Sequence, residues 1–260
     1  MIDLRGSRAV VSGASRGIGA ATARMLAASG ADVVVGYRSR AADAEGVAAD
    51  VRAAGRRAET CGADLTTPGG CEALVGAAVD AFGGVDVVVV NHGVWPADEV
   101  PVAAMDDARW GRTMREDLDS VFWLSRAAAR ALTGTAERRR SRDGGRLVLV
   151  SSTAGQRGEA FHADYAASKG AMISFVKSLA VELAPAGVTV NCVAPGWVDT
   201  EMTAPAMQAG GRERIAATIP VGRVATAEDV AGPILFLCSP LARHVTGEVL
   251  NVNGGSVLCG

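Results

Sequence analysis

The sequence has few aromatic residues, almost no net charge and no long hydrophobic run. Aromatic residues make up 4% of the 260 residues, and the formal net charge is -2 at pH 7. A charge this close to zero gives no sign of a surface for nucleic acid or for a membrane. The apolar runs, such as residues 87–90 and 234–238, fall well short of the roughly 20 residues of a membrane-spanning helix. The first five residues lack the layout of a signal peptide, so we expect a cytoplasmic protein.

Several motifs that would indicate other chemistry are also missing. The five cysteines are irregularly spaced and form no CxxC pair, which excludes a disulfide framework and a zinc site, and we expect no metal. The sequence contains no GxxxxGK[ST] loop, which disfavours a P-loop nucleotidase. Neither Ser151 nor Ser152 has the G-x-S-x-G context of a serine hydrolase. His162 and His244 have no partner pattern and are interpreted as structural or solvated.

What the sequence does contain is a regular alternation of strand-like and helix-like segments. Strands are expected at residues 8–12, 32–37, 58–62, 85–91, 146–151, 188–193 and 248–252. Helices are expected at residues 18–29, 41–54, 68–82, 107–132, 164–183 and 228–237, with Thr67 as the N-cap of the third. This rhythm predicts a parallel sheet with right-handed crossovers. It runs without a linker, so residues 1–260 are predicted to form one domain.

Two stretches interrupt the rhythm. Residues 196–224 are predicted to be irregular, and connections of that length are uncommon unless they are functional. Residues 136–145 contain Arg138, Arg139, Arg140 and Arg142. This arginine cluster is interpreted as a solvated loop, or alternatively as a docking site for an acidic carrier protein, whose binding would weaken with salt.

A glycine-rich turn lies between the first strand and the first helix. It reads Ser12-Gly13-Ala14-Ser15-Arg16-Gly17-Ile18-Gly19. Glycine lets the backbone turn sharply and approach a pyrophosphate, while the following helix directs its free N–H groups toward the anion. Gly19 would let the helix pack closely on the strand. The spacing is not GxGxxG, so the turn alone is weak support for dinucleotide binding.

The end of the second strand favours a phosphorylated coenzyme. A carboxylate there would hold the ribose diol of NAD, but residues 36–39 contain no acid. Arg38 and Arg16 are instead suited to a 2′-phosphate, because guanidinium pairs well with phosphate oxygens. We predict that NADPH is preferred over NADH.

A serine, a tyrosine and a lysine form a candidate catalytic set. Tyr165 and Lys169 are four residues apart on an expected helix and so share a face. A nearby ammonium would lower the pKa of Tyr165 and suit it to donate a proton to a carbonyl oxygen. Ser152 follows a strand at the end where open α/β sheets place their chemistry.

Together these motifs resemble those of the classical short-chain dehydrogenase/reductase family, over nearly the whole chain. The family's glycine motif appears at residues 12–19 with serine for threonine, its NNAG motif appears at residues 90–93 with two departures, and Tyr165 lies 13 positions after Ser152. The resemblance implies a Rossmann-type, doubly wound α/β fold with seven mostly parallel strands and helices on both faces. It also implies that Ser152, Tyr165 and Lys169 are catalytic. The implied cofactor-binding residues are Gly13, Ser15, Arg16, Gly17, Ile18, Gly19, Arg38, Ser39, Asp64, Leu65, Asn91, Gly93, Tyr165, Lys169, Pro195, Gly196, Val198 and Thr200.

The chain departs from the family pattern at functional positions. Asp117 stands where the family has a catalytic asparagine that helps to hold a water beside the lysine, largely through the backbone. The substitution is interpreted as tolerated, or alternatively as a carboxylate that pairs with Lys169 and changes its proton affinity. His92 replaces a small residue beside the cofactor. His92, Trp95 and Trp197 are interpreted as packing residues, or alternatively as residues that narrow the substrate pocket.

The expected reaction is reversible, NADPH-dependent reduction of a ketone, such as a 3-oxoacyl thioester, to a secondary alcohol. The 3-oxoacyl-acyl carrier protein reductase branch is the most similar, and a specialised-metabolism ketoreductase or a sugar or steroid alcohol dehydrogenase is the alternative. A cofactor-binding regulator without catalysis is a further alternative. By resemblance, residues 201–215 are expected to form a substrate lid. The resemblance also implies a homotetramer built through the helices at 107–132 and 164–183 and the C-terminal strand.

Overall fold

The structure is a computed structural model that describes residues 2–134 and 144–259. These residues form a seven-stranded sheet in the order β3-β2-β1-β4-β5-β6-β7, in which every neighbouring pair is parallel. The strands are β1 (Arg8–Val11), β2 (Asp32–Tyr37), β3 (Ala58–Gly62), β4 (Val87–Val90), β5 (Gly145–Val150), β6 (Val188–Pro195) and β7 (Val249–Val252). The doubly wound fold is confirmed, and the sheet is entirely rather than mostly parallel.

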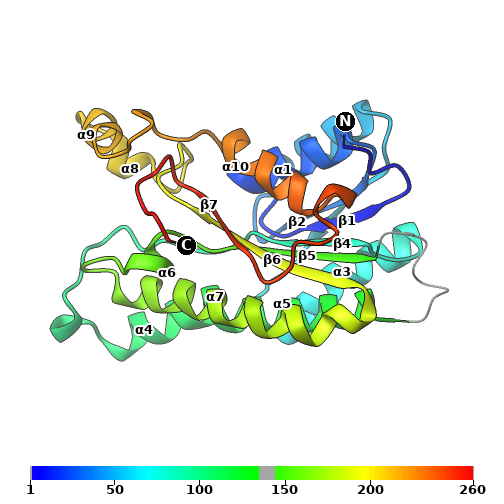
Figure 1. The fold of residues 1–260 in the computed structure, drawn as a ribbon, viewed down its shortest axis with the longest axis horizontal. Helices are drawn as coiled ribbons and strands as arrows, with labels where there is room; N and C mark the ends of the chain where they lie inside the picture. The colour runs from blue at the N-terminus through cyan, green and yellow to red at the C-terminus, as the bar shows by residue number, and fades with distance from the viewer. Residues whose placement is uncertain (1, 135–143, 260) are drawn as a thin grey trace.

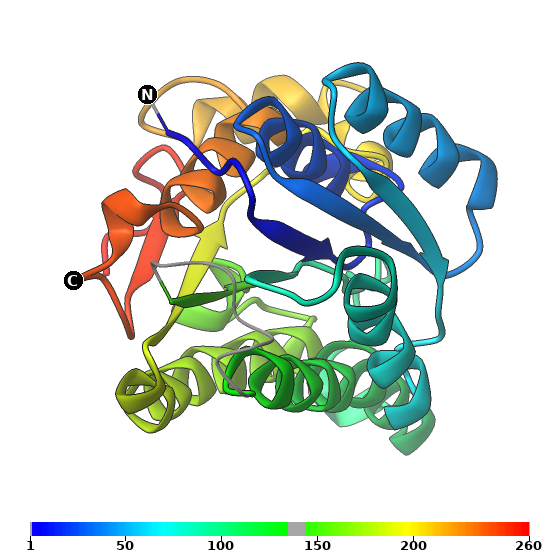
Figure 2. The same ribbon diagram turned by 90° about the vertical axis from the view of Figure 1, so that its right-hand side faces the viewer.

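Helices cover both faces of the sheet (Figures 1 and 2). One layer contains α1 (Gly17–Ala28), α2 (Ala41–Ala53) and α10 (Ala227–Leu237), and the other contains α3 (Pro68–Phe82), α5 (Ser120–Leu132) and α7 (Ala163–Leu183). Alternate strand residues supply the two cores, so that Val11 packs with the first layer and Val10 with the second. Successive side chains of a strand point to opposite faces, which is why the valine runs are apolar at every position.

The expected single helix at 107–132 contains a break in its hydrogen-bonding pattern. The chain forms α4 (Asp107–Met114), a π-helical segment η2 (Arg115–Asp119) and then α5. A π-helical segment inserts an extra residue into the turn, and such segments often occur at functional sites. Apolar periodicity did not indicate it, because the helix axis continues through the segment. Asp117 lies within it.

The expected irregular stretch at 196–224 also contains structure. It includes two short helices, α8 (Ala204–Met207) and α9 (Gly211–Ala217), which project at one end of the molecule (Figure 1). Helices this short carry little periodic signal. The remaining short elements are α6 (Ala154–Arg157) and the 3-10 turns η1 (Val102–Ala104), η3 (Ala184–Ala186) and η4 (Pro240–Ala242).

Several smaller expectations were tested directly. Thr67 caps α3 as predicted, with its hydroxyl accepting a hydrogen bond from the Gly70 N–H. Strand β4 is shorter than the expected 85–91, and β6 extends two residues beyond the expected 193. In the described part of the chain, no helix combines the length and the apolar character needed to cross a membrane. The arginine cluster at 138–142 lies outside the described residues.

Candidate active site

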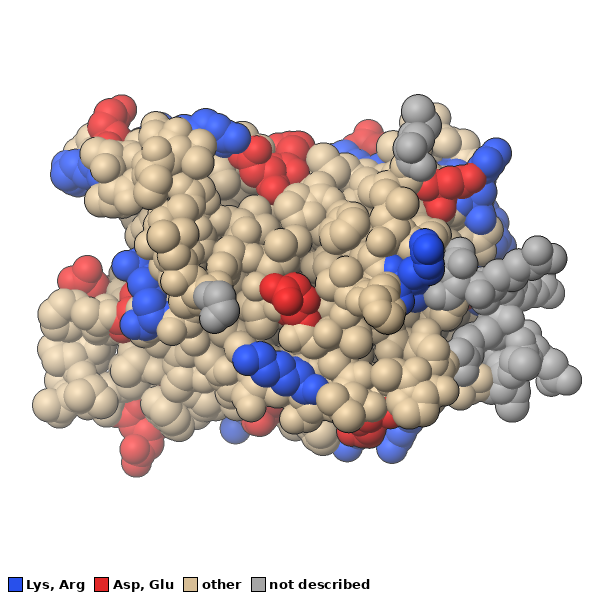
Figure 3. Space-filling view, viewed as in Figure 1, with Lys and Arg blue, Asp and Glu red and all other residues tan. Residues whose placement is uncertain are grey.

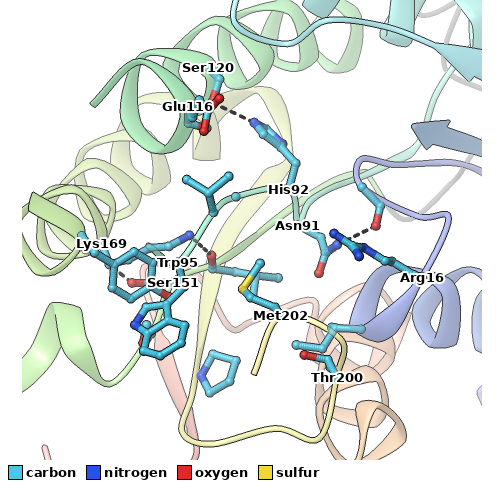
Figure 4. A pocket seen from close by; sticks show the side chains of 18 of the residues that line it. Arg16, Asn91, His92, Trp95, Glu116, Ser120, Ser151, Lys169, Thr200 and Met202 are labelled. Atoms are coloured by element: carbon cyan, nitrogen blue, oxygen red, sulfur yellow. Dashed lines mark hydrogen bonds between the residues drawn. The ribbon is translucent and has the colours of Figure 1, made fainter. Parts of the chain in front are cut away.

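A cleft opens at the carboxyl ends of the strands, around the point between β1 and β4 where the strand order reverses. Open α/β sheets bind their ligands at this position. Most of the residues predicted from the sequence to bind cofactor or substrate line this one cleft (Figure 4). The predicted residues that line it are Gly13, Ser15, Arg16, Ile18, Arg38, Ser39, Asp64, Leu65, Asn91, His92, Gly93, Trp95, Ser152, Tyr165, Lys169, Pro195, Gly196, Trp197, Val198 and Thr200. Gly17, Gly19 and Asp117 lie behind this lining.

The glycine-rich turn is held in place by the neighbouring strand. The Asn91 side-chain amide donates to the carbonyl oxygens of Ser12 and Gly13, at 3.1 and 3.2 Å. A Cβ atom on Gly19 would stand 2.6 Å from Asn91 Nδ2 and closer still to the Gly13 carbonyl oxygen, so only glycine fits there. Gly13 and Gly17 have φ angles of 61° and 53°, which other residues rarely adopt.

The first helix then directs an uncapped N-terminus at the cleft. Arg16 precedes α1 and makes no side-chain capping hydrogen bond, and the first turn contains no acidic residue. The free N–H groups and the positive end of the helix dipole favour an anion at this position. The turn and the helix therefore fit the pyrophosphate of a dinucleotide.

The ends of β2 and β3 supply further polar groups to the cleft. Arg38, Ser39 and Asp64 line the cleft there. The Asp64 carboxylate accepts from the backbone N–H and the hydroxyl of Thr66, at 3.0 and 2.7 Å, and the hydroxyl hydrogen bond is the main reason why its pKa is lowered. These contacts fix the carboxylate at the loop where the resemblance expects it to meet the adenine.

Ser152, Tyr165 and Lys169 converge from β5 and α7. The Lys169 ammonium donates to the Val150 carbonyl oxygen at 3.3 Å and lies 5.6 Å from the centre of the Tyr165 ring. Lys169 is 4% exposed and Tyr165 is 9% exposed. The predicted i, i+4 face of α7 thus brings the phenol and the ammonium to the same wall of the cleft.

The pKa of Tyr165 differs from the expectation. Burial raises it, while the hydrogen bond with Ser152 lowers it by a smaller amount. The net shift is upward, opposite to the lowering expected from the sequence. The sequence spacing predicted that Tyr165 and Lys169 lie close together, but it did not predict how deeply Tyr165 is buried. Burial disfavours a charged phenolate.

Asp117 is a fully buried carboxylate beside this set. Its Oδ1 accepts from the Val94 backbone N–H at 2.7 Å, and its Oδ2 has no hydrogen-bond partner among the described residues. Burial raises the pKa of Asp117 to about 6, although the charge of Lys169 opposes the shift. A Cβ atom on Gly93 would stand 3.0 Å from both Asp117 Oδ1 and Lys169 Nζ, so the glycine leaves the two groups facing each other.

The His92 ring links the end of β1 to the start of α5, and it does not face Trp95 and Trp197. Its Nδ1 lies 2.8 Å from the Ser12 hydroxyl, and its Nε2 lies 2.9 Å from the Ser120 hydroxyl (Figure 4). The Ser120 hydroxyl donates to the Glu116 carbonyl oxygen, so it accepts from His92 Nε2–H. Burial lowers the pKa of His92 to about 3, which keeps the ring neutral.

Two tryptophans and a histidine form an aromatic wall beside Tyr165. The Trp95 ring stacks on His162 with centroids 5.2 Å apart, and it meets Trp197 edge-on at 5.8 Å. The indole Nε1 donates to Glu159 at 3.1 Å, which fixes the orientation of the ring. Trp95 and Trp197 were identified from the sequence, whereas Glu159 and His162 were not. Their contacts with Trp95 span more than 60 positions of the chain, and no local pattern indicates them.

A buried polar group anchors the start of α7, next to Tyr165. The Asp164 carboxylate accepts from the Thr113 hydroxyl at 2.7 Å and from Arg109 Nε at 3.2 Å. Burial alone would raise the pKa of Asp164, but these hydrogen bonds have the larger combined effect. The pKa of Asp164 is therefore lower than its ordinary value. Sequence analysis missed this network, which ties α4 to α7 directly beside Tyr165.

Comparisons with known proteins agree with this geometry. A family model described as Enoyl-(Acyl carrier protein) reductase matches residues 13–256. A 3-oxoacyl-acyl carrier protein reductase of Vibrio cholerae is 39% identical over 254 residues, which cover 98% of each chain. This chain belongs to the short-chain dehydrogenase/reductase family. It is therefore an NAD(P)-dependent oxidoreductase.

Two further family members extend the comparison. A monensin polyketide synthase putative ketoacyl reductase of Streptomyces virginiae is 38% identical, over 95% of each chain. A short chain dehydrogenase of Burkholderia cenocepacia, solved in complex with NADP, superposes with a TM-score of 0.88. It is 37% identical, over 97% of this chain and 98% of its own.

Proposed function

We propose that this short-chain dehydrogenase/reductase uses NADPH to reduce a ketone, of the 3-oxoacyl thioester type, to a secondary alcohol. The observation that carries the proposal is the convergence of Ser152, Tyr165 and Lys169 on the cleft that also contains the glycine-rich turn. The relative from V. cholerae, a 3-oxoacyl-acyl carrier protein reductase, supports this substrate class.

Each residue of the set has a distinct role in the proposal. When bound, the coenzyme would supply the hydride that the carbonyl carbon accepts. The Tyr165 hydroxyl gives its proton to the carbonyl oxygen, so that one O–H bond breaks as another forms. The Ser152 hydroxyl donates a hydrogen bond that orients this oxygen. Lys169 binds the nicotinamide ribose, and its charge offsets the cost of the buried phenolate that Tyr165 becomes.

Asp117 is proposed to stand at the relay position behind Lys169. Its Oδ1 accepts the Val94 N–H, an interaction that an asparagine oxygen would also make. Asp117 lies in the π-helical segment η2, and π-helical segments are frequent at functional sites. The carboxylate adds a titratable group that the family asparagine lacks.

The remaining cleft residues are proposed to bind coenzyme and substrate. Val198 and Thr200 would hold the carboxamide, and Asp64 the adenine. The preference for NADPH over NADH rests on Arg16 and Arg38, and the NADP complex of the B. cenocepacia relative supports it. Residues 201–215 are proposed as the substrate lid. His92 acts at this site by positioning Ser12 and Ser120.

A specialised-metabolism ketoreductase remains the second candidate. The aromatic wall of Trp95 and Trp197 favours it, because flat indole rings suit a planar cyclic ketone as well as an acyl chain. The S. virginiae relative, a putative ketoacyl reductase of polyketide synthesis, points in the same direction. The homotetramer, the cytoplasmic location and the acidic carrier partner remain part of the proposal.

Loss of NADPH absorbance with a substrate panel tests the reaction. The panel contains an acetoacetyl thioester, 1-tetralone as a planar cyclic ketone, and a crotonyl thioester as a substrate for double-bond reduction. We expect turnover of a ketone that falls at least about a thousandfold in Tyr165→Phe. Turnover of the crotonyl thioester alone, or full activity of Tyr165→Phe, would reject the proposal. Binding of NADPH without turnover of any ketone would favour a regulator.

A further inference from the structure

Glu201, at the start of the proposed lid, forms ion pairs with two arginines that line the cleft. Its Oε2 accepts from Arg16 Nη1 at 2.6 Å and lies 2.8 Å from Arg40 Nη2. Arg16 precedes α1 and Arg40 precedes α2, whereas Glu201 follows β6 and Thr200. One carboxylate therefore connects the loop after β6 with the glycine-rich turn and with the start of the second helix.

The two arginines line the part of the cleft where no acid follows β2. Arg16, Arg38 and Arg40 all contribute to the cleft surface there. A guanidinium group presents the same fork of N–H donors to a carboxylate and to a phosphate. The carboxylate of Glu201 thus occupies N–H groups that would otherwise be open to a phosphate.

The charges in this part of the cleft are already balanced within the chain. Arg38 is held by Glu116 at 3.3 Å, and Arg40 contacts Asp43 at 3.2 Å in addition to Glu201. The three guanidinium groups thus lie beside Glu201, Glu116 and Asp43, and Arg38 also interacts with the charge of Asp64. A phosphate monoester carries between one and two negative charges at neutral pH, so it must displace at least one carboxylate to gain a full ion pair. Glu201 is the carboxylate that contacts two of the three arginines.

We propose that Glu201 competes with the 2′-phosphate of the coenzyme for Arg16 and Arg40, and so sets the preference between NADPH and NADH. The inference rests on the proposed NADPH preference and adds two residues to it. NADH has no anion at this position, so its binding leaves the Glu201 contacts in place. Glu201 therefore weakens the binding of NADPH and leaves that of NADH unchanged.

Isothermal titration calorimetry of NADPH and NADH with Glu201→Gln tests the competition. The three side chains are 44–55% exposed, and exposed ion pairs are individually weak, so we expect NADPH to bind about three- to tenfold more tightly. The dissociation constant of NADH should change by less than about twofold. Glu213→Gln is the matched control, because it removes the same charge from the same segment without an ion pair to Arg16 or Arg40 among the described residues. It should change neither constant.

Arg40→Gln completes a double-mutant cycle. It should weaken NADPH more than NADH, and Glu201→Gln should have a smaller effect in its presence, because one of the two contested groups is gone. Equal tightening of both coenzymes by Glu201→Gln would show a general charge effect and overturn the inference, as would no change in either constant. A wild-type enzyme that binds NADH more tightly would reject the NADPH preference itself. The two failures are therefore distinguishable.

Discussion

At Asp117, an ionisable group occupies a position that is completely closed to solvent. One oxygen has a backbone donor and the other has no partner among the residues described, so the charged form is only partly compensated. Burial raises the pKa of this carboxyl to about 6, which places its titration within the range where enzymes are assayed. The residue is neutral in mildly acidic solution and charged above neutrality.

The pH dependence of stability should therefore change in Asp117→Asn. A carboxyl whose pKa is higher in the folded state contributes stability below its ordinary value of 3.8, and this contribution is lost as the pH rises through about 6. Asparagine does not titrate. The melting temperature of the variant relative to wild type should rise by roughly 2–5 °C between pH 5 and pH 8. Thermal unfolding by circular dichroism at both pH values measures this.

The control for this prediction is the activity of the same variant at pH 8. It should stay within about tenfold of wild type, because the asparagine oxygen keeps the Val94 contact. A pH-independent difference in melting temperature would show that Asp117 does not titrate between pH 5 and pH 8.

Among the elements, the turn between β1 and α1 leaves no room for a larger residue at its last glycine. Its backbone is fixed by hydrogen bonds from Asn91, and it packs so tightly against Gly19 that no side chain fits there. The glycines at 69 and 76, on α3 in the opposite helix layer, have open space around the position of a Cβ atom. Close packing therefore requires glycine at position 19 of α1, whereas it does not require glycine at positions 69 and 76 of α3.

Gly19→Ala should lower both stability and coenzyme affinity. The added methyl group would overlap the Gly13 carbonyl oxygen and push α1 away from the turn. We expect the dissociation constant of NADPH to rise at least about tenfold, since the anion-binding N–H groups of α1 would move. Calorimetric titration measures it, and Gly76→Ala, in the interior of α3, is the control that should bind as wild type does. Unchanged binding by Gly19→Ala would contradict the packing described here.

For the whole molecule, the surface of the layer formed by α5 and α7 carries exposed apolar side chains. Phe122 on α5 is 44% exposed and Val181 on α7 is 78% exposed. Figure 3 shows one acidic group at the centre of the face that contains the C-terminal strand, with mostly uncharged surface around it. Side chains of this kind become buried where subunits pack against each other. These features support the predicted homotetramer.

A charge placed on this surface should weaken the assembly. Val181→Lys would bury an ammonium if α7 packs against a second copy, so we expect a smaller particle by size-exclusion chromatography with light scattering. Val102→Lys is the control, because Val102 is 73% exposed but lies in η1, outside both helices. If wild type and Val181→Lys elute as the same assembly, α7 does not form the interface.

The sequence by itself determined the features that depend on short-range order. Valine runs predicted the buried parallel strands, the i, i+4 spacing put Tyr165 and Lys169 on one face, and the glycine spacing predicted the turn. In each case a local periodicity or a conformational restriction carries the information. The order of the motifs along the chain then indicated the family.

Only the tertiary structure decided how distant side chains meet. It introduced the π-helical segment at Asp117, engaged both nitrogens of His92, stacked Trp95 on His162 and brought Glu201 to Arg16. It also reversed the expected shift in the pKa of Tyr165, because the extent of burial is set by the packing of the whole cleft. Glu201 and Arg16 are 185 positions apart, and no local pattern relates them. The strand order of the sheet brings the loops that carry them to the same edge.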